Sequence, residues 1–316
     1  MRGRIAPVLV ALAVMPGAIG AQSSAELSVL GHAALERRDP RVAVEHFTAG
    51  LELHPADYAA NWGMALALLQ LGSDFPQDGK SPRRDALYGR AEALARRAVA
   101  ADSGDVQGWF VLANAIGRAS LTRSSRERVR RAAEIRDAAR RAVALDPRHA
   151  GAWHVLGRWH AEVMRLSGVQ RFFARSFLGG RALGDASWDS ATVYLERAVA
   201  LDPERLVHRV ALAAVYADRG RYTDARAQLD AAARLADVDY GDGRERQAGD
   251  ELLIRIEGRA DRRTQPRYRS RAESMPSSMR SRSSRRRRRS SRRVRREASP
   301  TRSRASSPSS RARRAS

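Results

Sequence analysis

The side chains best suited to metal binding or acid–base chemistry in this 316-residue chain are its seven histidines. His154 and His160 lie six residues apart, a spacing that places them on different faces of a helix and suits a shared metal ion poorly. The His-Glu-x-x-His pairing of many zinc proteases does not occur in the sequence. We therefore interpret the histidines as structural or surface residues and predict no metal site.

The sequence also lacks the motifs that hold a catalytic nucleophile or a phosphate group. It contains no cysteine, which excludes disulfides, thiolate zinc sites and a cysteine nucleophile. It has no Gly-x-Ser-x-Gly elbow, glycine-rich phosphate loop or dinucleotide fingerprint. Acidic pairs such as Glu134 and Asp137 stand among arginines that would pair with them on a charged helix face. The sequence predicts neither an enzyme nor a cofactor.

The elements that position these side chains are helices, because apolar residues recur with helical spacing from Ala25 to about Ile256. The first segment combines small and large apolar residues at fixed spacing and closes on a proline. Its positions are Leu27, Leu30, Gly31, Ala34, Ala43, Phe47, Gly50 and Pro55. The small residues stand where two helices must approach closely, and the proline ends the second helix.

The second half of this unit recurs along the chain, most visibly in the similar segments 96–102, 140–146 and 196–202. The units close at Pro55, Ser103, Pro147, Pro203 and Asp237. Relative to a period of about 34 residues, insertions fall between the two helices of the second, third and fourth units. They cover residues 72–85, 117–126 and about 165–185. The sequence therefore predicts about five helix-turn-helix repeats.

This pattern resembles the tetratricopeptide repeat. Within that class, Trp153 and the Gly157-Arg158-Trp159 helix, followed by an insertion, resemble the regulator of microtubule dynamics family, over roughly residues 24–240. The resemblance implies an all-α fold, a right-handed α-solenoid of about five repeats over residues 24–256. It also implies a role in binding other proteins, and in the family's eukaryotic members an association with microtubules and organelle membranes.

A tetratricopeptide array uses its first helices to line a concave groove for a partner. Carrying that face along the register gives eight candidates: Trp62, Leu66, Phe110, Asn114, Arg118, His154, Arg158 and Glu162. Such a mixture suits an extended peptide or a carboxylate, because a guanidinium binds a carboxylate through two parallel hydrogen bonds. The same residues also fit a purely structural interpretation, with Trp62 and Phe110 in the interhelical core and Arg158 paired with Glu162.

The net charge of +23 is concentrated in one segment. Residues 262–316 hold 21 arginines and two acids, so they carry a net charge of +19 and leave the rest of the chain nearly neutral. This segment is also rich in serine and poor in apolar residues, so we predict a disordered basic tail at 257–316. Its densest part consists of Arg285, Arg286, Arg287, Arg288, Arg289, Arg292 and Arg293.

Three interpretations of this tail remain open. As a polycation it would bind anionic lipid, lipopolysaccharide or nucleic acid through counterion release. It also resembles the Arg-Ser segments of RNA-processing proteins, although Tyr268 is its only aromatic residue. Alternatively, it is the product of a GC-rich reading frame translated out of register, because an Arg/Ser/Ala/Pro composition without lysine is typical of such a frame.

The N-terminus has the order of a secretory signal peptide. Arg2 and Arg4 precede an apolar run, and small residues follow up to Ala21. Cleavage near that point would release the chain into the periplasm or outer envelope; an uncleaved N-terminus would anchor it in the membrane. We thus predict a signal peptide at 1–21 and an exported, non-enzymatic adaptor that binds a protein or peptide in its groove. The alternatives are anionic-surface or nucleic-acid binding by the tail, and cytoskeletal association.

Overall fold

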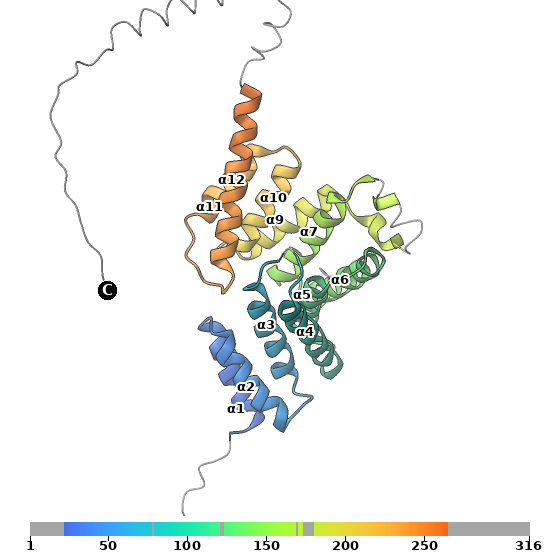
Figure 1. Cartoon of the computed structure of the whole chain (residues 1–316), viewed down its shortest axis with the longest axis vertical. Coiled ribbons are helices and arrows are strands. Elements are labelled where there is room, and N and C mark those ends of the chain that lie inside the picture. Colours follow the sequence, from blue (N-terminus) through green and yellow to red (C-terminus); the bar gives the residue numbers. More distant parts are fainter. Residues whose placement is uncertain (1–21, 78, 121–122, 169, 173–179, 265–316) are drawn as a thin grey trace, which may run out of the picture. The chain divides into compact units, whose positions relative to one another are not determined.

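The computed structural model describes residues 22–77, 79–120, 123–168, 170–172 and 180–264. Within these ranges every element of regular structure is a helix (Figure 1). The all-α prediction is therefore confirmed. The predicted signal peptide at 1–21 and the seven arginines singled out in the tail lie outside the described residues.

Consecutive helices pack as five pairs, and each first helix also contacts the first helix of the next pair. This second set of contacts lines the first helices up side by side, as the repeat register predicts. The pairs are α1 (Ser24–Glu36) with α2 (Pro40–Leu53), α3 (Tyr58–Ser73) with α4 (Pro82–Ala101), α5 (Val106–Ala119) with α6 (Ser125–Leu145), α7 (Ala150–Arg165) with α9 (Trp188–Leu201), and α10 (Leu206–Asp218) with α11 (Tyr222–Ala232).

Most of these helices begin just after a residue whose side chain accepts a hydrogen bond from a backbone amide of the first turn. At the start of α1, the Ser23 hydroxyl accepts a hydrogen bond from the Glu26 amide, and the Glu26 carboxylate accepts one from the Ser23 amide at 2.8 Å. This reciprocal arrangement is a capping box. Asp39 caps α2 and is followed by Pro40, whose missing N–H costs nothing in the first turn. Each such cap stabilises its helix by about 1 kcal/mol.

Close approach within the pairs depends on small residues facing large ones. A Cβ added at Gly31 would lie 2.5 Å from Cε1 of Phe47, which is fully buried between the helices. In the fourth repeat, a Cβ at Gly157 would lie 2.6 Å from Cγ of Leu195. Either addition would force the helices apart and overpack the core. The small residues predicted to permit close contact do so here.

The predicted insertions partly take the form of longer helices. α4 and α6 have 20 and 21 residues, whereas α2 in the first repeat has 14. Part of each insertion lengthens the second helix at its start, and the rest lies in the connections at 74–81 and 120–124, which are longer than the connection at 37–39 in the first repeat. In the fourth repeat the described part of the insertion includes a 3-10 helix, η1 (Gly180–Asp185).

A further helix, α12 (Asp242–Thr264), follows the fifth pair. Its Leu252 and Ile256 are buried in one apolar cluster with Leu229 and other residues of α10 and α11. α12 thus packs its apolar side against the fifth repeat. α12 continues to Thr264, and the compact unit that contains the repeats ends at Glu257, one residue from the boundary that we placed at 256. None of the described helices combines the length and apolar character that a bilayer-spanning segment requires.

Candidate partner-binding face

The eight predicted groove residues lie on three neighbouring first helices. Within each helix they are four residues apart, so they share one side of it, and α3, α5 and α7 contact one another in sequence. We call this side the first-helix face. Its members are Trp62 and Leu66 on α3, Phe110, Asn114 and Arg118 on α5, and His154, Arg158 and Glu162 on α7.

The apolar members of the face also belong to the core. Trp62, Leu66 and Phe110 are only partly buried, but all three pack against the buried cluster formed by the first repeats. The Trp62 ring lies 4.3 Å from the His32 ring between centroids, and Phe110 lies 4.7 Å from His149 in the same measure. Their packing agrees with the structural interpretation, while part of each side chain remains accessible.

His154 is buried and paired. Its Nδ1 lies 3.1 Å from Nδ1 of His208 on α10, so one ring donates and the other accepts. Burial lowers the pKa of His154 well below its usual value, and the charges of Arg158 and Arg118 act in the same direction. Burial likewise lowers the pKa of His208 to about 4. The pair is therefore neutral at pH 7 and joins the fourth and fifth repeats.

Three other members of the face bond to residues of their own helix. The Asn114 side-chain amide donates to the Phe110 carbonyl at 3.0 Å. Arg158 is about half exposed and lies 3.6 Å from Glu162, as the structural interpretation anticipated. Glu162 makes a closer ion pair, at 2.7 Å, with Arg165, which also bonds Asp218 on α10 at 2.7 Å. Because these charges are well exposed, such pairs contribute little stability.

Arg118 differs from its neighbours because no described residue forms a hydrogen bond or an ion pair with it. Its side chain is only partly exposed. Burial lowers the pKa of its guanidinium, the charges of Arg158 and Arg244 lower it further, and the Glu245 carboxylate opposes them. The face therefore holds one guanidinium that is partly removed from water and forms no hydrogen bond or ion pair with a described residue.

The sequence analysis missed several residues next to this face. His32 on α1 occupies the position equivalent to Leu66. Arg244 at the start of α12 lies near the end of α3, where it bonds Asp74. The 34-residue register does not extend to Arg244, because the positions 34 residues after the buried Ala213 and Tyr216 are the exposed Gln247 and Asp250. His208 stands off the face in that register, so only the structure shows its contact with His154.

A bridge joins the start of α12 to the end of α3 on this side. Asp74 accepts hydrogen bonds from the Tyr240 hydroxyl at 2.6 Å and from Arg244 at 3.0 Å, and Arg244 also donates to the Ser73 hydroxyl. Nearby, Arg38 donates to the Asp237 carbonyl at 3.0 Å. Beside these contacts is a cavity of about 420 Å³, lined by residues that include Glu36, Gln70, Asp202, Glu204 and Tyr240.

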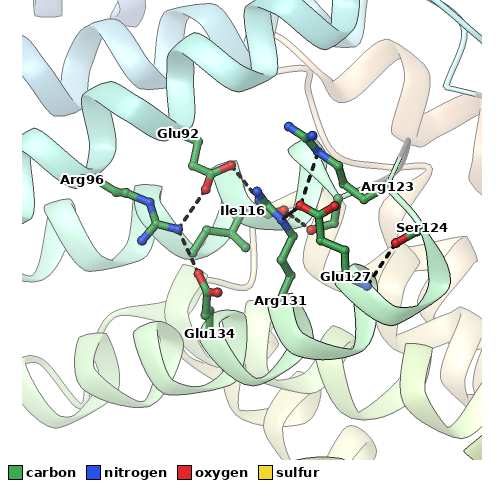
Figure 2. A network of polar contacts seen from close by, with 9 residues as sticks. Glu92, Arg96, Ile116, Arg123, Ser124, Glu127, Arg131 and Glu134 are labelled. Atoms are coloured by element: carbon green, nitrogen blue, oxygen red, sulfur yellow. Dashed lines mark hydrogen bonds and ion pairs between the residues drawn. The ribbon is translucent and has the colours of Figure 1, made fainter. Parts of the chain in front are cut away.

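The second helices carry charges that are paired with each other. Figure 2 shows Glu92 on α4 between Arg131 of α6, at 2.7 Å, and Arg96, at 2.8 Å. Arg96 also reaches Glu134 at 2.8 Å, and Arg131 reaches Glu127 at 3.2 Å. Burial opposes the charge of Glu92, but the hydrogen bonds from Arg131 and Arg96 prevail and lower its pKa. The prediction that Glu134 and Asp137 pair with arginines is confirmed, since Asp137 bonds Arg136 at 2.9 Å.

Comparison with models of known protein families identifies the family of this chain. A model of the family described as "Regulator of microtubule dynamics protein 1-3" matches residues 32–257. The chain belongs to this family. The match reaches into α12, further than the resemblance we traced in the sequence, and ends before the arginine-rich segment. No curated protein sequence gave a significant match.

Solved structures similar to this one include several tetratricopeptide proteins. TTC0263 of Thermus thermophilus is 22% identical, with a TM-score of 0.53, and the alignment covers 73% of this chain and 99% of that one. PilF of Pseudomonas aeruginosa is 14% identical, with a TM-score of 0.45, over 80% and 97% of the two chains. YrrB, described as having an unusual peptide-binding site, is 14% identical, with a TM-score of 0.41, over 74% and 92%. The Thermus protein supports the repeat fold, and the family match agrees with it.

Proposed function

We propose that this protein is a non-enzymatic interaction scaffold that holds a peptide segment of a partner protein on its first-helix face, in the cell envelope. The observation that carries the proposal is Arg118. Within the described part of the chain its guanidinium forms no hydrogen bond or ion pair, and it lies in the last turn of α5 on a face that also offers Trp62, Leu66 and Asn114. A bound segment would replace water as the hydrogen-bond acceptor of this guanidinium.

A scaffold role also fits the titratable groups of the face. General acid–base catalysis needs a side chain that is free to exchange a proton with a substrate. His154 is instead bonded to His208, and Glu162 is bonded to Arg165. The His154 contact joins neighbouring repeats and the Glu162 pair lies within α7, so what the face offers a ligand is shape, apolar surface and an arginine.

Site-specific photocrosslinking tests this proposal. A photoreactive amino acid at position 114, on the first-helix face, is expected to form a discrete adduct with the partner in the native cell. The matched control is position 193, because Val193 is exposed on the second helix α9. Adducts of equal yield at both positions, or at neither, would contradict binding on this face.

The proposed location rests on the order of charged, apolar and small residues in the first 21 positions. We expect the mature chain in the periplasmic or outer-envelope fraction, with an N-terminus near residue 22. Cell fractionation with N-terminal sequencing measures both properties. A full-length chain in the membrane fraction would favour the anchored alternative, and a full-length chain in the cytoplasm would exclude export.

A second candidate function rests on the charge of +19 carried by residues 262–316. A segment of this kind would bind anionic lipid, lipopolysaccharide or nucleic acid with an affinity that falls steeply as salt rises. The comparison requires a chain truncated after Thr264, because α12 extends to that residue. Binding of anionic vesicles that survives the truncation would rule out the tail as the binding element.

A further inference from the structure

The cavity beside the bridge between α12 and α3 is formed by parts of the chain that are far apart in sequence. Its lining includes Leu35, Glu36 and Arg38 at the end of the first helix of the array, and Gln70 near the end of α3. The other lining residues belong to the connections before and after the fifth repeat. Because a repeat in a solenoid contacts mainly its neighbours, this volume of about 420 Å³ is a feature of this chain and not of the repeat itself.

Hydrogen bonds hold the two sides of the cavity in place. Arg38 donates to the Asp237 carbonyl at 3.0 Å, next to the lining residue Val238. The Tyr240 hydroxyl donates to Asp74 at 2.6 Å. A site whose walls are already fixed loses less side-chain freedom when a ligand binds. The cavity is therefore preorganised.

Gln70 supplies an acceptor that lacks a donor. Its Oε1 atom is buried, and no described residue donates a hydrogen bond to it. Only three other side-chain oxygens of the described residues share this condition, and none of them lines the cavity. A buried acceptor without a donor lowers the stability of a fold, so a ligand that brings an N–H or O–H group to Gln70 would remove this cost.

The charged residues of the lining leave the cavity negative. It contains four carboxylates and two guanidinium groups, those of Glu36, Asp202, Glu204, Asp239, Arg38 and Arg205. Arg205 is bonded to Asp202 and Asp239. By contrast, Glu36 and Glu204 form no ion pair or side-chain hydrogen bond with a described residue. One further cation, Arg41, acts on Tyr240 from outside the lining and does not cancel the excess of negative charge.

Negative charge together with an unused acceptor selects a cation that carries hydrogen-bond donors. A guanidinium suits the cavity better than an ammonium group, because its five N–H groups point outward in one plane and can reach acceptors on different walls. The apolar lining residues Leu35 and Val238 can cover the aliphatic stem that carries such a group. An anionic ligand would meet the excess negative charge and be repelled.

We propose that this cavity is a second binding site, which takes the guanidinium of an arginine side chain or of a small arginine-like molecule. Gln70 Oε1 accepts one of its N–H groups, and the carboxylates of Glu36 and Glu204 balance its charge. The site goes beyond the proposed function, since none of the eight residues of the first-helix face lines the cavity. Either site can therefore exist without the other.

A pair of compounds of the same shape tests the chemistry. N-acetylarginine methylamide carries one guanidinium and no other charge, and the corresponding citrulline compound replaces it with a neutral urea group. In NMR titrations with the full-length protein, the arginine compound is expected to bind at least about tenfold more tightly. Equal affinities, or no binding of the arginine compound, would overturn the proposal and leave the scaffold function standing.

Two variants test the place of binding. The double variant Glu36→Gln with Glu204→Gln removes charge from exposed positions that make no bond, so it should fold as the parent protein does. It and Gln70→Met should each weaken binding of the arginine compound by about tenfold. Glu45→Gln is the matched control, because Glu45 is exposed on α2 and lies outside the lining.

The arginine-rich segment is present in the parent protein and in every variant, so it affects all of these measurements alike. An affinity that neither the double variant nor Gln70→Met changes would overturn the proposal, as would an equal loss in the control. A pentapeptide with blocked ends and one central arginine then separates the two sources of the guanidinium. Tighter binding of the pentapeptide than of the single residue would identify a protein side chain, and equal or weaker binding a small molecule. Both results support the site.

Discussion

Arg118 on α5 and Arg131 on α6 belong to the same repeat, but their guanidinium groups have opposite surroundings. Arg131 lies in a network of carboxylates that links the second helices α4 and α6. Arg118 lies on the first-helix face with no bonded partner among the described residues. The two arginines of one helical hairpin therefore differ in bonding: Arg131 links neighbouring second helices through carboxylates, whereas Arg118 forms no such link.

The largest expected effect comes from breaking a satisfied arginine on the second-helix side. Arg84→Met leaves the Pro76 and Gly79 carbonyls and the Asp85 carboxylate without their donor. We expect a loss of about 4 kcal/mol in the free energy of unfolding, measured by urea denaturation. The neighbouring Arg83→Met is the control, since Arg83 is exposed and should change stability by less than about 0.5 kcal/mol. A loss of equal size in both variants would contradict the distinction.

The second largest effect is expected from acid, which should destabilise the contact between His154 and His208. Burial lowers the pKa of His208 to about 4 from an ordinary value of 6.5, so below pH 6.5 the unfolded chain binds more protons than the folded one. Stability should therefore fall as the pH drops from about 6.5 to about 4, by about 3 kcal/mol for this group. His208→Asn should flatten that slope, while His54→Asn, at an exposed site, should leave it unchanged. Parallel slopes in all three proteins would contradict the assignment.

A substitution in the carboxylate–arginine network of the second helices should lower the free energy of unfolding by less, because several groups share the hydrogen bonds of this network. Arg131→Met is expected to cost about 2 kcal/mol, since Glu92 keeps its bond to Arg96. In the double variant with Glu92→Gln, the loss should be smaller than the sum of the two single losses. The pKa of Glu92 is lowered, so the stability that its ionised carboxylate contributes is present at neutral pH. This stability is lost only as the pH falls through the lowered pKa, below the usual carboxyl range and below the range in which His208 acts. Strictly additive losses would show that the two side chains do not interact.

The smallest effect is expected at the exposed pair of the first-helix face. Arg158 lies 3.6 Å from Glu162, and both side chains are about half exposed. Arg158→Gln should therefore change the free energy of unfolding by less than about 0.5 kcal/mol. A loss above about 1 kcal/mol in the same urea titration would mean that Arg158 has a structural role like that of Arg131.

The sequence was sufficient to predict the repeats because close helix packing restricts residue size at fixed positions. Gly31 facing Phe47, and Gly157 facing Leu195, are constraints within one hairpin, so they leave a local signal. The same register placed Arg118, His154 and the other candidates on one side of the first helices. The register could not show which of these side chains is already bonded within the protein, because such bonds depend on contacts between repeats.

The missed features are those made by residues far apart in the chain. The bond between His154 and His208 spans 54 residues, and the bond between Asp74 and Arg244 spans 170. No spacing rule relates such positions. The packing of α12 is another contact of this kind, since its Leu252 and Ile256 join an apolar cluster with residues of α10 and α11.

The hydrogen bonds between the start of α12 and the end of α3 affect how the terminal helices of this array should unfold locally. In a simple solenoid each repeat contacts only its neighbours, so the terminal repeats open independently of the rest. Here Asp74 bonds Tyr240 and Arg244, and Arg38 bonds the Asp237 carbonyl, so the last helix is tied to the first two repeats. Amide hydrogens near the two termini of the array should then exchange with solvent together, in one cooperative opening. Asp74→Asn would uncouple them and allow α12 to open alone.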